Sequence, residues 1–135
     1  MIRIVVLTAL AAVLVSAANA YSHHSAAAVY NVQDEAQIEG ELAQVALRNP
    51  HSWIFVMAPD ENGAMKRWGV EWGAARQLTE QGAANSLRVG DKVVVTGNPG
   101  RDPKDYRMLM ISIVRPADGF SWGLREGEVV EGARE

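Results

Sequence analysis

The three histidines are the side chains of this sequence that are best suited to chemistry. His23 and His24 are adjacent near the N-terminus, and His51 follows the dipeptide Asn49-Pro50. Imidazole nitrogens bind copper, zinc and nickel, and the chain has no cysteine that could supply thiolate ligands. The histidines therefore predict a metal site built from nitrogen donors, with copper preferred and zinc or nickel as alternatives.

Two arrangements of these donors are open, and the first uses the start of the exported chain. If export removes residues 1–20, the new N-terminus reads Tyr21-Ser22-His23. Its α-amine, two amide nitrogens and the third-residue imidazole form a square-planar set of four nitrogens, a geometry that selects Cu(II) or Ni(II). This chelate depends on the cleavage point, because a different first residue abolishes it.

The second arrangement brings His23, His24 and His51 together. The segment from His24 to Ile38 spans up to roughly 45 Å when extended, and a strand from there to residue 47 is only about 30 Å long. The N-terminal arm is therefore long enough to return to the turn. Three imidazoles with an open position suit copper or zinc, with the α-amine or Glu71 as an additional ligand. The plainer alternatives are a cap of the turn by His51 and a disordered start.

Catalytic motifs are absent from the sequence. There is no Gly-x-Ser-x-Gly, no phosphate-binding loop and no His-Glu-x-x-His. Glu39, Glu41 and Glu71 fit solvated strand faces better than an acid–base pair, which requires two carboxylates at a fixed separation. We therefore expect a binding protein and not an enzyme.

The four tryptophans suggest the rival function. Trp53, Trp68 and Trp72 lie at positions that we expect to face the core, whereas Trp122 lies outside the predicted strands. A metal-free barrel could present a face that includes Trp122 to a sugar or to a protein partner. Nucleic acid is not expected, because the formal net charge is −3 and no long basic cluster occurs.

Several short motifs resemble a known family. They are the start Tyr21-Ser22-His23-His24-Ser25, the corner Asn49-Pro50-His51-Ser52-Trp53, the pair Trp68 and Glu71, and the segment Leu87-Arg88-Val89-Gly90-Asp91. Together they resemble a family of small exported bacterial proteins catalogued as domain of unknown function 6152. The resemblance implies a small exported β-rich domain and no settled activity. It favours the metal hypothesis, because the same histidines are among the matching residues.

The N-terminus has the order of a secretory signal peptide. Met1-Ile2-Arg3 precedes an apolar run over 4–15 and the small residues of 16–20. The apolar run is too short to span a bilayer, so no membrane span is expected after cleavage. Removal of 1–20 takes away one arginine and no acid, which changes the net charge from −3 to −4. We expect a periplasmic or secreted protein, in an oxidising compartment where copper is handled.

The rest of the chain predicts an all-β fold with one short helix. Apolar alternation indicates strands, and a change of phase within 37–47 suggests a bulge in the first strand. The second strand is apolar on both faces, with Trp53, Phe55 and Met57 on one of them. Asn62-Gly63 favours a hairpin turn, and residues 98–100 favour another. The predicted strands cover 37–47, 52–58, 67–72, 92–97 and 107–115, with the helix at 74–81.

The element order β-β-β-α-β-β predicts a five-stranded OB-like barrel. An open antiparallel β sheet with a packed helix is the alternative, because the same pattern permits it. The expected organisation is a signal peptide at 1–20, an N-terminal arm at 21–36, the barrel domain at 37–122 and a mobile acidic tail at 123–135. The barrel would be the scaffold and the arm would carry two of the ligands.

Overall fold

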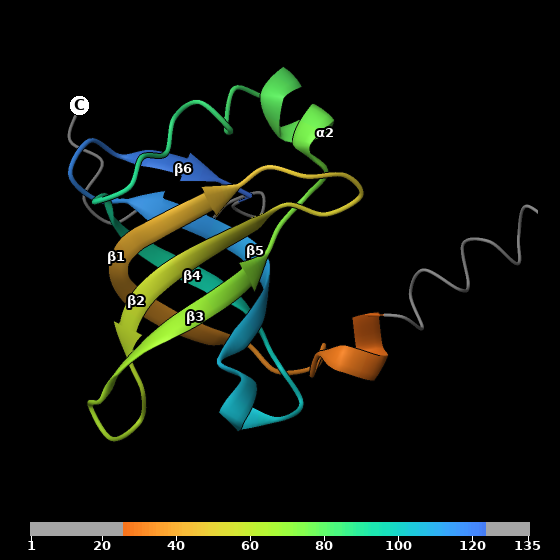
Figure 1. Cartoon of the computed structure of the whole chain (residues 1–135), viewed down its shortest axis with the longest axis vertical. Helices are drawn as coiled ribbons and strands as arrows, with labels where there is room; N and C mark the ends of the chain where they lie inside the picture. Colours follow the sequence, from red (N-terminus) through yellow and green to blue (C-terminus); the bar gives the residue numbers. More distant parts are fainter. Residues whose placement is uncertain (1–25, 124–135) are drawn as a thin grey trace, which may run out of the picture.

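The first strand, β1 (Ala36–Ala46), bends so that its two halves pair with different neighbours. In the computed structural model, which describes residues 26–123, its first half pairs with β4 (Lys92–Pro99) and its second half with β2 (Trp53–Pro59). The register shifts between Leu42 and Gln44, which confirms the predicted bulge. The bend turns what would be a flat sheet into a curved one (Figure 1).

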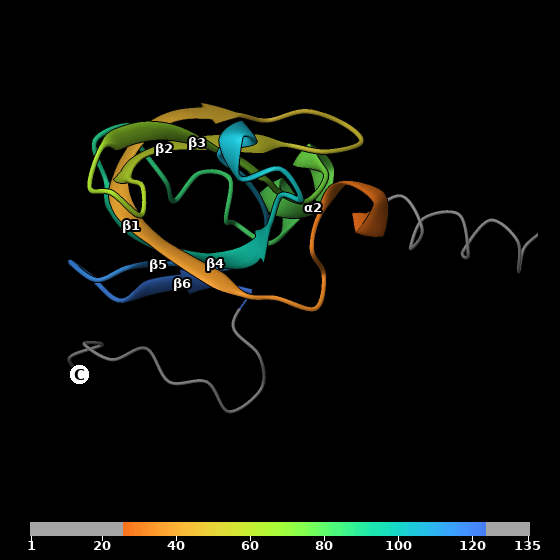
Figure 2. The same cartoon turned by 90° about the horizontal axis from the view of Figure 1, so that it is seen from below.

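The sheet closes through β3 and β5. β3 (Met65–Glu71) pairs with β2 and, in parallel, with β5 (Arg107–Arg115), while β5 also pairs with β4. This closure confirms the predicted five-stranded all-β barrel over the open-sheet alternative (Figures 1 and 2). The helix α2 (Ala75–Glu80) lies between β3 and β4, and the 3-10 helix η1 (Pro103–Asp105) lies between β4 and β5.

The core fills the barrel with aliphatic side chains. On β2 the buried residues are Ile54, Val56 and Ala58, which alternate with half-buried Trp53, Phe55 and Met57. A buried face on every strand is the expected consequence of closure. The other fully buried large side chains come from four strands and α2: Leu42, Val70, Leu78, Val93, Val95, Met108 and Ile113.

Three details differ from the expectations. Trp53 was predicted to face the core, but it lies half-buried on the outer face of β2 because Ile54 and Val56 occupy the interior. The turn predicted at 98–100 is wrong, since β4 continues to Pro99, which pairs with Met108. Residues Phe120–Trp122 form a further strand, β6, paired with β5, whereas the last predicted strand ended at residue 115 and Trp122 was placed outside the strands.

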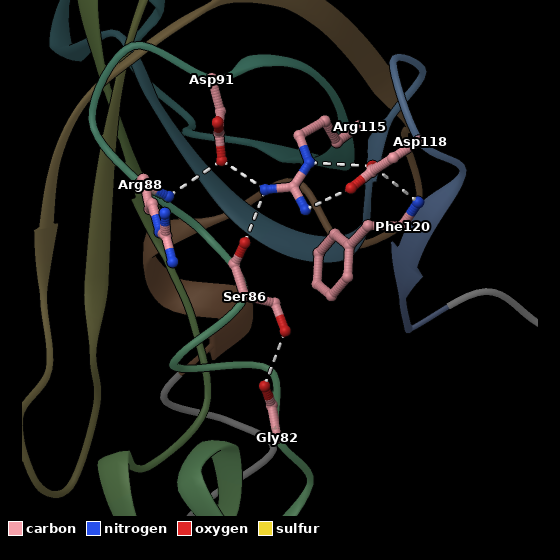
Figure 3. A network of polar contacts seen from close by, with 7 residues as sticks. All are labelled: Gly82, Ser86, Arg88, Asp91, Arg115, Asp118 and Phe120. Atoms are coloured by element: carbon pink, nitrogen blue, oxygen red, sulfur yellow. Dashed lines mark hydrogen bonds and ion pairs between the residues drawn. The ribbon is translucent and has the colours of Figure 1, made fainter.

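Arg115 joins the end of β5 to a distant segment, residues 86–91, and to the turn that follows β5. Its guanidinium contacts Asp91 at 2.5 Å and Asp118 at 2.7 Å, and it also donates to the Ser86 carbonyl (Figure 3). Its carbon Cζ lies 5.2 Å from the centre of the Phe120 ring. The contacts tie the end of β5 to the segment before β4 and to β6.

Gly40 gives a direct test of the bend in β1. A Cβ atom at this position would lie 2.1 Å from the Met57 carbonyl oxygen, so the backbones of β1 and β2 would have to separate. We expect Gly40→Ala to lower the free energy of unfolding by at least about 2 kcal/mol, measured by urea denaturation. Gly63→Ala is the control, because only its positive φ of 79° is strained and no atom lies within 4 Å; it should cost about 1 kcal/mol. Equal losses would contradict this account.

The Arg115 cluster predicts a loss of stability in acid. The hydrogen bond from Arg115 lowers the pKa of Asp118. Burial would raise the pKa of Asp91, but hydrogen bonds from the Arg88 backbone and Arg115 outweigh it, so that pKa is lowered too. A depressed folded-state pKa means that the stabilisation is complete above the ordinary carboxyl range near 3.8 and is lost as the pH falls through the lowered values.

Urea denaturation between pH 6 and pH 2 measures this dependence. We expect stability to fall below about pH 4, and to fall less steeply in Arg115→Met, which has no charge to lower either pKa. Arg76→Met, which removes an exposed ion pair on α2, is the matched control. Identical pH profiles for the wild type and Arg115→Met would show that the cluster does not carry the effect.

Candidate functional site

The corner that carries His51 is fixed by its neighbour Ser52. Ser52 is fully buried; its N–H donates to the Gly73 carbonyl at 3.0 Å, and its carbonyl accepts from Trp72 at 2.8 Å. Its hydroxyl accepts from the Arg48 N–H at 3.1 Å and closes the loop on itself. The peptide bond between Asn49 and Pro50 within this loop is cis. The loop between β1 and β2 is thus held against the end of β3.

This arrangement places His51 beside Glu71, the last residue of β3. The imidazole Nδ1 lies 3.1 Å from Glu71 Oε1. The His51 side chain is 57% exposed, whereas that of Glu71 is 18% exposed. When Nδ1 carries the proton and donates it to the carboxylate, Nε2 of the neutral ring is the nitrogen with a free lone pair. The carboxylate therefore determines which nitrogen of His51 is available to a ligand.

Tyr30 of the N-terminal arm holds the other oxygen of the same carboxylate. Its hydroxyl donates to Glu71 Oε2 at 2.5 Å, and its side chain is buried, with 2% exposed. Burial raises the pKa of Tyr30 far above its ordinary value, and the bond to Glu71 raises it further. The hydroxyl therefore keeps its proton at neutral pH and remains a donor. Tyr30 is hydrogen-bonded to Glu71, and Glu71 lies 3.1 Å from His51, so the three residues form a chain of polar contacts from the interior to the surface.

The backbone around Tyr30 attaches the arm to the barrel. Tyr30 forms a bridge with Gly100, and the Asn31 N–H donates to the Pro99 carbonyl at 2.8 Å. Arg101 donates through its backbone N–H to the Val29 carbonyl at 3.0 Å. The arm lies on the side of the barrel from which the loop between β1 and β2 also projects (Figures 1 and 2).

Arg107 borders this chain of residues. Its guanidinium carbon is 5.6 Å from the centre of the Tyr30 ring and 5.5 Å from that of the Trp53 ring. Gly100 makes room for it, because a Cβ there would lie 2.5 Å from Arg107 Cγ. The positive charge opposes the rise in the pKa of Tyr30, although burial and Glu71 dominate. Trp53 pairs across the strands with Glu71, so an indole lies next to the candidate site.

The predicted site residues have different outcomes. The structure places Glu71, which was considered as an additional ligand, 3.1 Å from His51. His23 and His24 lie outside the described residues, so their part in the site stays a prediction. Within residues 26–123 no group of three or more histidine, aspartate or glutamate side chains is arranged to hold a metal ion. A site with three histidine or carboxylate ligands at this corner would need at least one donor from outside residues 26–123.

Sequence reasoning missed Tyr30 and Arg107. Tyr30 lies in a polar segment without periodicity, and Arg107 begins an ordinary strand. No local signal distinguishes either residue, since only the closed barrel brings them to Glu71 and Trp53. Trp122, considered as part of a binding face, packs edge-on against Trp72 at 5.3 Å and donates its N–H to Gln81 at 2.8 Å.

The fold and the corner define a small β-barrel protein with a histidine oriented by a carboxylate. Residues 10–108 match the model of the Family of unknown function (DUF6152), so the chain belongs to that family. Comparison with curated proteins and with solved structures gives no match. Neither the family nor the barrel gives a sign of catalytic activity. In the part of the chain that is described, no helix has the length and apolarity needed to cross a membrane.

The bond between Tyr30 and Glu71 predicts a measurable coupling. Tyr30→Phe should lower the free energy of unfolding by about 1 to 3 kcal/mol, because it leaves a largely buried carboxylate oxygen without its donor. A double-mutant cycle with Glu71→Gln, followed by urea denaturation, isolates the pair. A coupling energy of at least about 0.5 kcal/mol is expected for groups in direct contact. Strictly additive losses would show that the bond does not contribute.

Proposed function

We propose that this protein is an exported copper-binding protein whose site combines His51 with His23 and His24 of the N-terminal arm. The observation that supports it most is the chain of polar contacts in which Tyr30 is hydrogen-bonded to Glu71 and Glu71 lies 3.1 Å from His51 Nδ1. Histidines that bind metals usually donate their second ring N–H to a carboxylate or carbonyl, which fixes the ring and makes the ligating nitrogen more basic. The Glu71 carboxylate lies 3.1 Å from His51 Nδ1, where it is placed to support the ring in this way, and Nε2 would then be the nitrogen that binds the metal.

The same contacts point to a supporting role for Glu71 and not to a role as a metal ligand. Both of its oxygens are engaged, one by His51 and the other by Tyr30. We therefore propose that Glu71 orients His51 and does not bind the metal directly, although it was considered as an additional ligand. The solvent-exposed imidazole is the ligand, and the less exposed carboxylate supports it.

The attachment of the arm supports the participation of His23 and His24. A helical turn over residues 26–29 precedes Tyr30, and one turn advances about 6 Å. His24 is two residues before Ala26, which adds at most about 7 Å. The chain from Tyr30 to His24 therefore spans at most about 13 Å. The phenol of Tyr30 already reaches Glu71, the partner of His51, so this span suffices for a shared site. Imidazole donors without thiolates favour Cu(II), with Zn(II) as the alternative.

Competition titration of Cu(II) into the exported chain, with its N-terminus defined by mass spectrometry, tests the proposal. His51→Ala should weaken Cu(II) binding at least tenfold, because it removes a ligand. Glu71→Gln should weaken it about 10- to 100-fold, the usual effect of losing such a supporting carboxylate. Glu41→Gln is the matched control, since it removes an exposed carboxylate that pairs with Lys92 on another strand, and it should leave the affinity unchanged.

Two further variants separate the arrangements. One extra residue at the N-terminus destroys the amine chelate of Tyr21-Ser22-His23 but leaves every imidazole in place. If the extension abolishes binding and His51→Ala does not change it, the N-terminal chelate acts alone and the three-histidine site is wrong. Quenching of tryptophan fluorescence by Cu(II) gives a second readout, because Trp53 pairs with Glu71; Trp53→Phe should remove most of it.

A further inference from the structure

A second candidate site is a pocket at the end of the barrel opposite α2. It lies between the turn that joins β2 to β3 and the loop that contains η1, which are both at the lower end in Figure 1. Its volume is about 480 Å³, within the range of small-molecule sites. Trp68 and Tyr106 form an aromatic wall, with ring centres 5.4 Å apart in an edge-on arrangement.

Three basic residues line the same pocket: Arg101 and Lys104 of the loop between β4 and β5, and Arg107 at the start of β5. Among residues 26–123, none of the three forms an ion pair with a carboxylate, whereas Lys66, Arg76, Lys92 and Arg115 all do. Arg107 is half-buried and contacts only the rings of Tyr30 and Trp53, so its N–H donors are not used by protein acceptors of the described chain. A guanidinium whose donors are not taken by protein acceptors has them available to an external anion.

Three acidic residues also line the pocket, Asp60, Glu61 and Asp102, and two of them are engaged by groups of the protein itself. The Asp60 carboxylate accepts the N–H groups of Asn62 and Ala64 at 2.9 Å and lies 3.8 Å from Lys66. Asp102 accepts the Lys104 N–H at the start of η1. Asp60 and Asp102 thus stabilise the turn and the loop that form two edges of the pocket. Glu61 is exposed, on the rim opposite the basic loop.

The backbone of Tyr106, which lines the pocket, has an unusual conformation. Tyr106 has a φ of 44°, in the left-handed region that bulky side chains rarely adopt. Residues held in that region are frequent at ligand sites. Here the conformation brings the Tyr106 ring against Trp68 and within 5.3 Å of the Lys66 ammonium, which completes the aromatic wall. Arg101 donates its Nε–H to the Ala27 carbonyl, which leaves Lys104 and Arg107 beside the two rings, an arrangement suited to a ligand that has a ring and a negative charge.

We propose that this pocket binds a small organic carboxylate attached to a ring. The carboxylate would accept hydrogen bonds from Arg107, which offers two parallel N–H donors, and Lys104 would add a second charge. The ring would pack against Trp68 and Tyr106. Sugar acids and aromatic acids share this chemistry. The site is separate from the proposed metal centre, so it stands or falls independently of copper binding.

Calorimetry on the exported chain in a chelator-containing buffer tests the proposal with two matched pairs of probes. Glucuronate is compared with glucose, and benzoate with benzyl alcohol. We expect at least one of the acids to bind while its neutral partner does not, and to bind more weakly in high salt. Whichever acid binds shows whether the pocket takes a sugar acid or an aromatic acid. Binding of neither acid, or equal binding of an acid and its neutral partner, would overturn the proposal.

Variants locate the binding on the protein. Lys104→Ala, an exposed change, should weaken the acid severalfold, and Arg107→Ala should weaken it at least tenfold. Tyr106→Asn removes the ring while keeping a residue type that tolerates the left-handed backbone, and it should also weaken binding. Arg76→Ala, on α2 at the opposite end, is the control for loss of a cation. Unchanged affinity in folded Lys104→Ala and Arg107→Ala would place the anion elsewhere and refute the site.

Discussion

The parallel pairing of β3 with β5 is the constraint on which the rest of the molecule depends. It closes the barrel, and it sets Gly69 beside Arg107 and Glu71 beside Leu109. Without this pairing the carboxylate of Glu71 would stand at an open sheet edge, and Arg107 would lie far from Trp53. The two strands are not consecutive in the chain, so their pairing brings together residues that are almost forty positions apart.

The bend in β1 makes that closure feasible. β1 pairs with both β2 and β4 because it changes direction near Gly40. There the β2 backbone lies too close to leave room for a side chain. The chain has no cysteine, so no disulfide supports this geometry. The aliphatic interior and the Arg115 cluster provide the support instead. Arg115 fixes the segments that enter β4 and leave β5, beyond the reach of the core (Figure 3).

The two candidate sites share one structural wall. Tyr30 contacts Glu71 on one side and Arg107 on the other, so the arm contributes to the proposed metal corner and borders the proposed anion pocket. The Glu71 carboxylate contacts His51 and Tyr30, whereas the Arg107 guanidinium lies over the rings of Tyr30 and Trp53, and Arg107 also lines the pocket. We infer that a change at Tyr30 would disturb the corner more than the pocket, because its hydrogen bond goes to Glu71 and its contact with Arg107 is through the ring.

The sequence by itself predicted the barrel, because apolar alternation and the order of elements are local properties that survive into the fold. It also singled out His51 and Glu71, whose residue types limit the chemistry available. Only the tertiary structure decided that Trp53 faces outward, that β4 runs through Pro99, and that Tyr30 and Arg107 adjoin the corner. These facts depend on strand register and closure, and such long-range pairings leave no periodic signal in the chain.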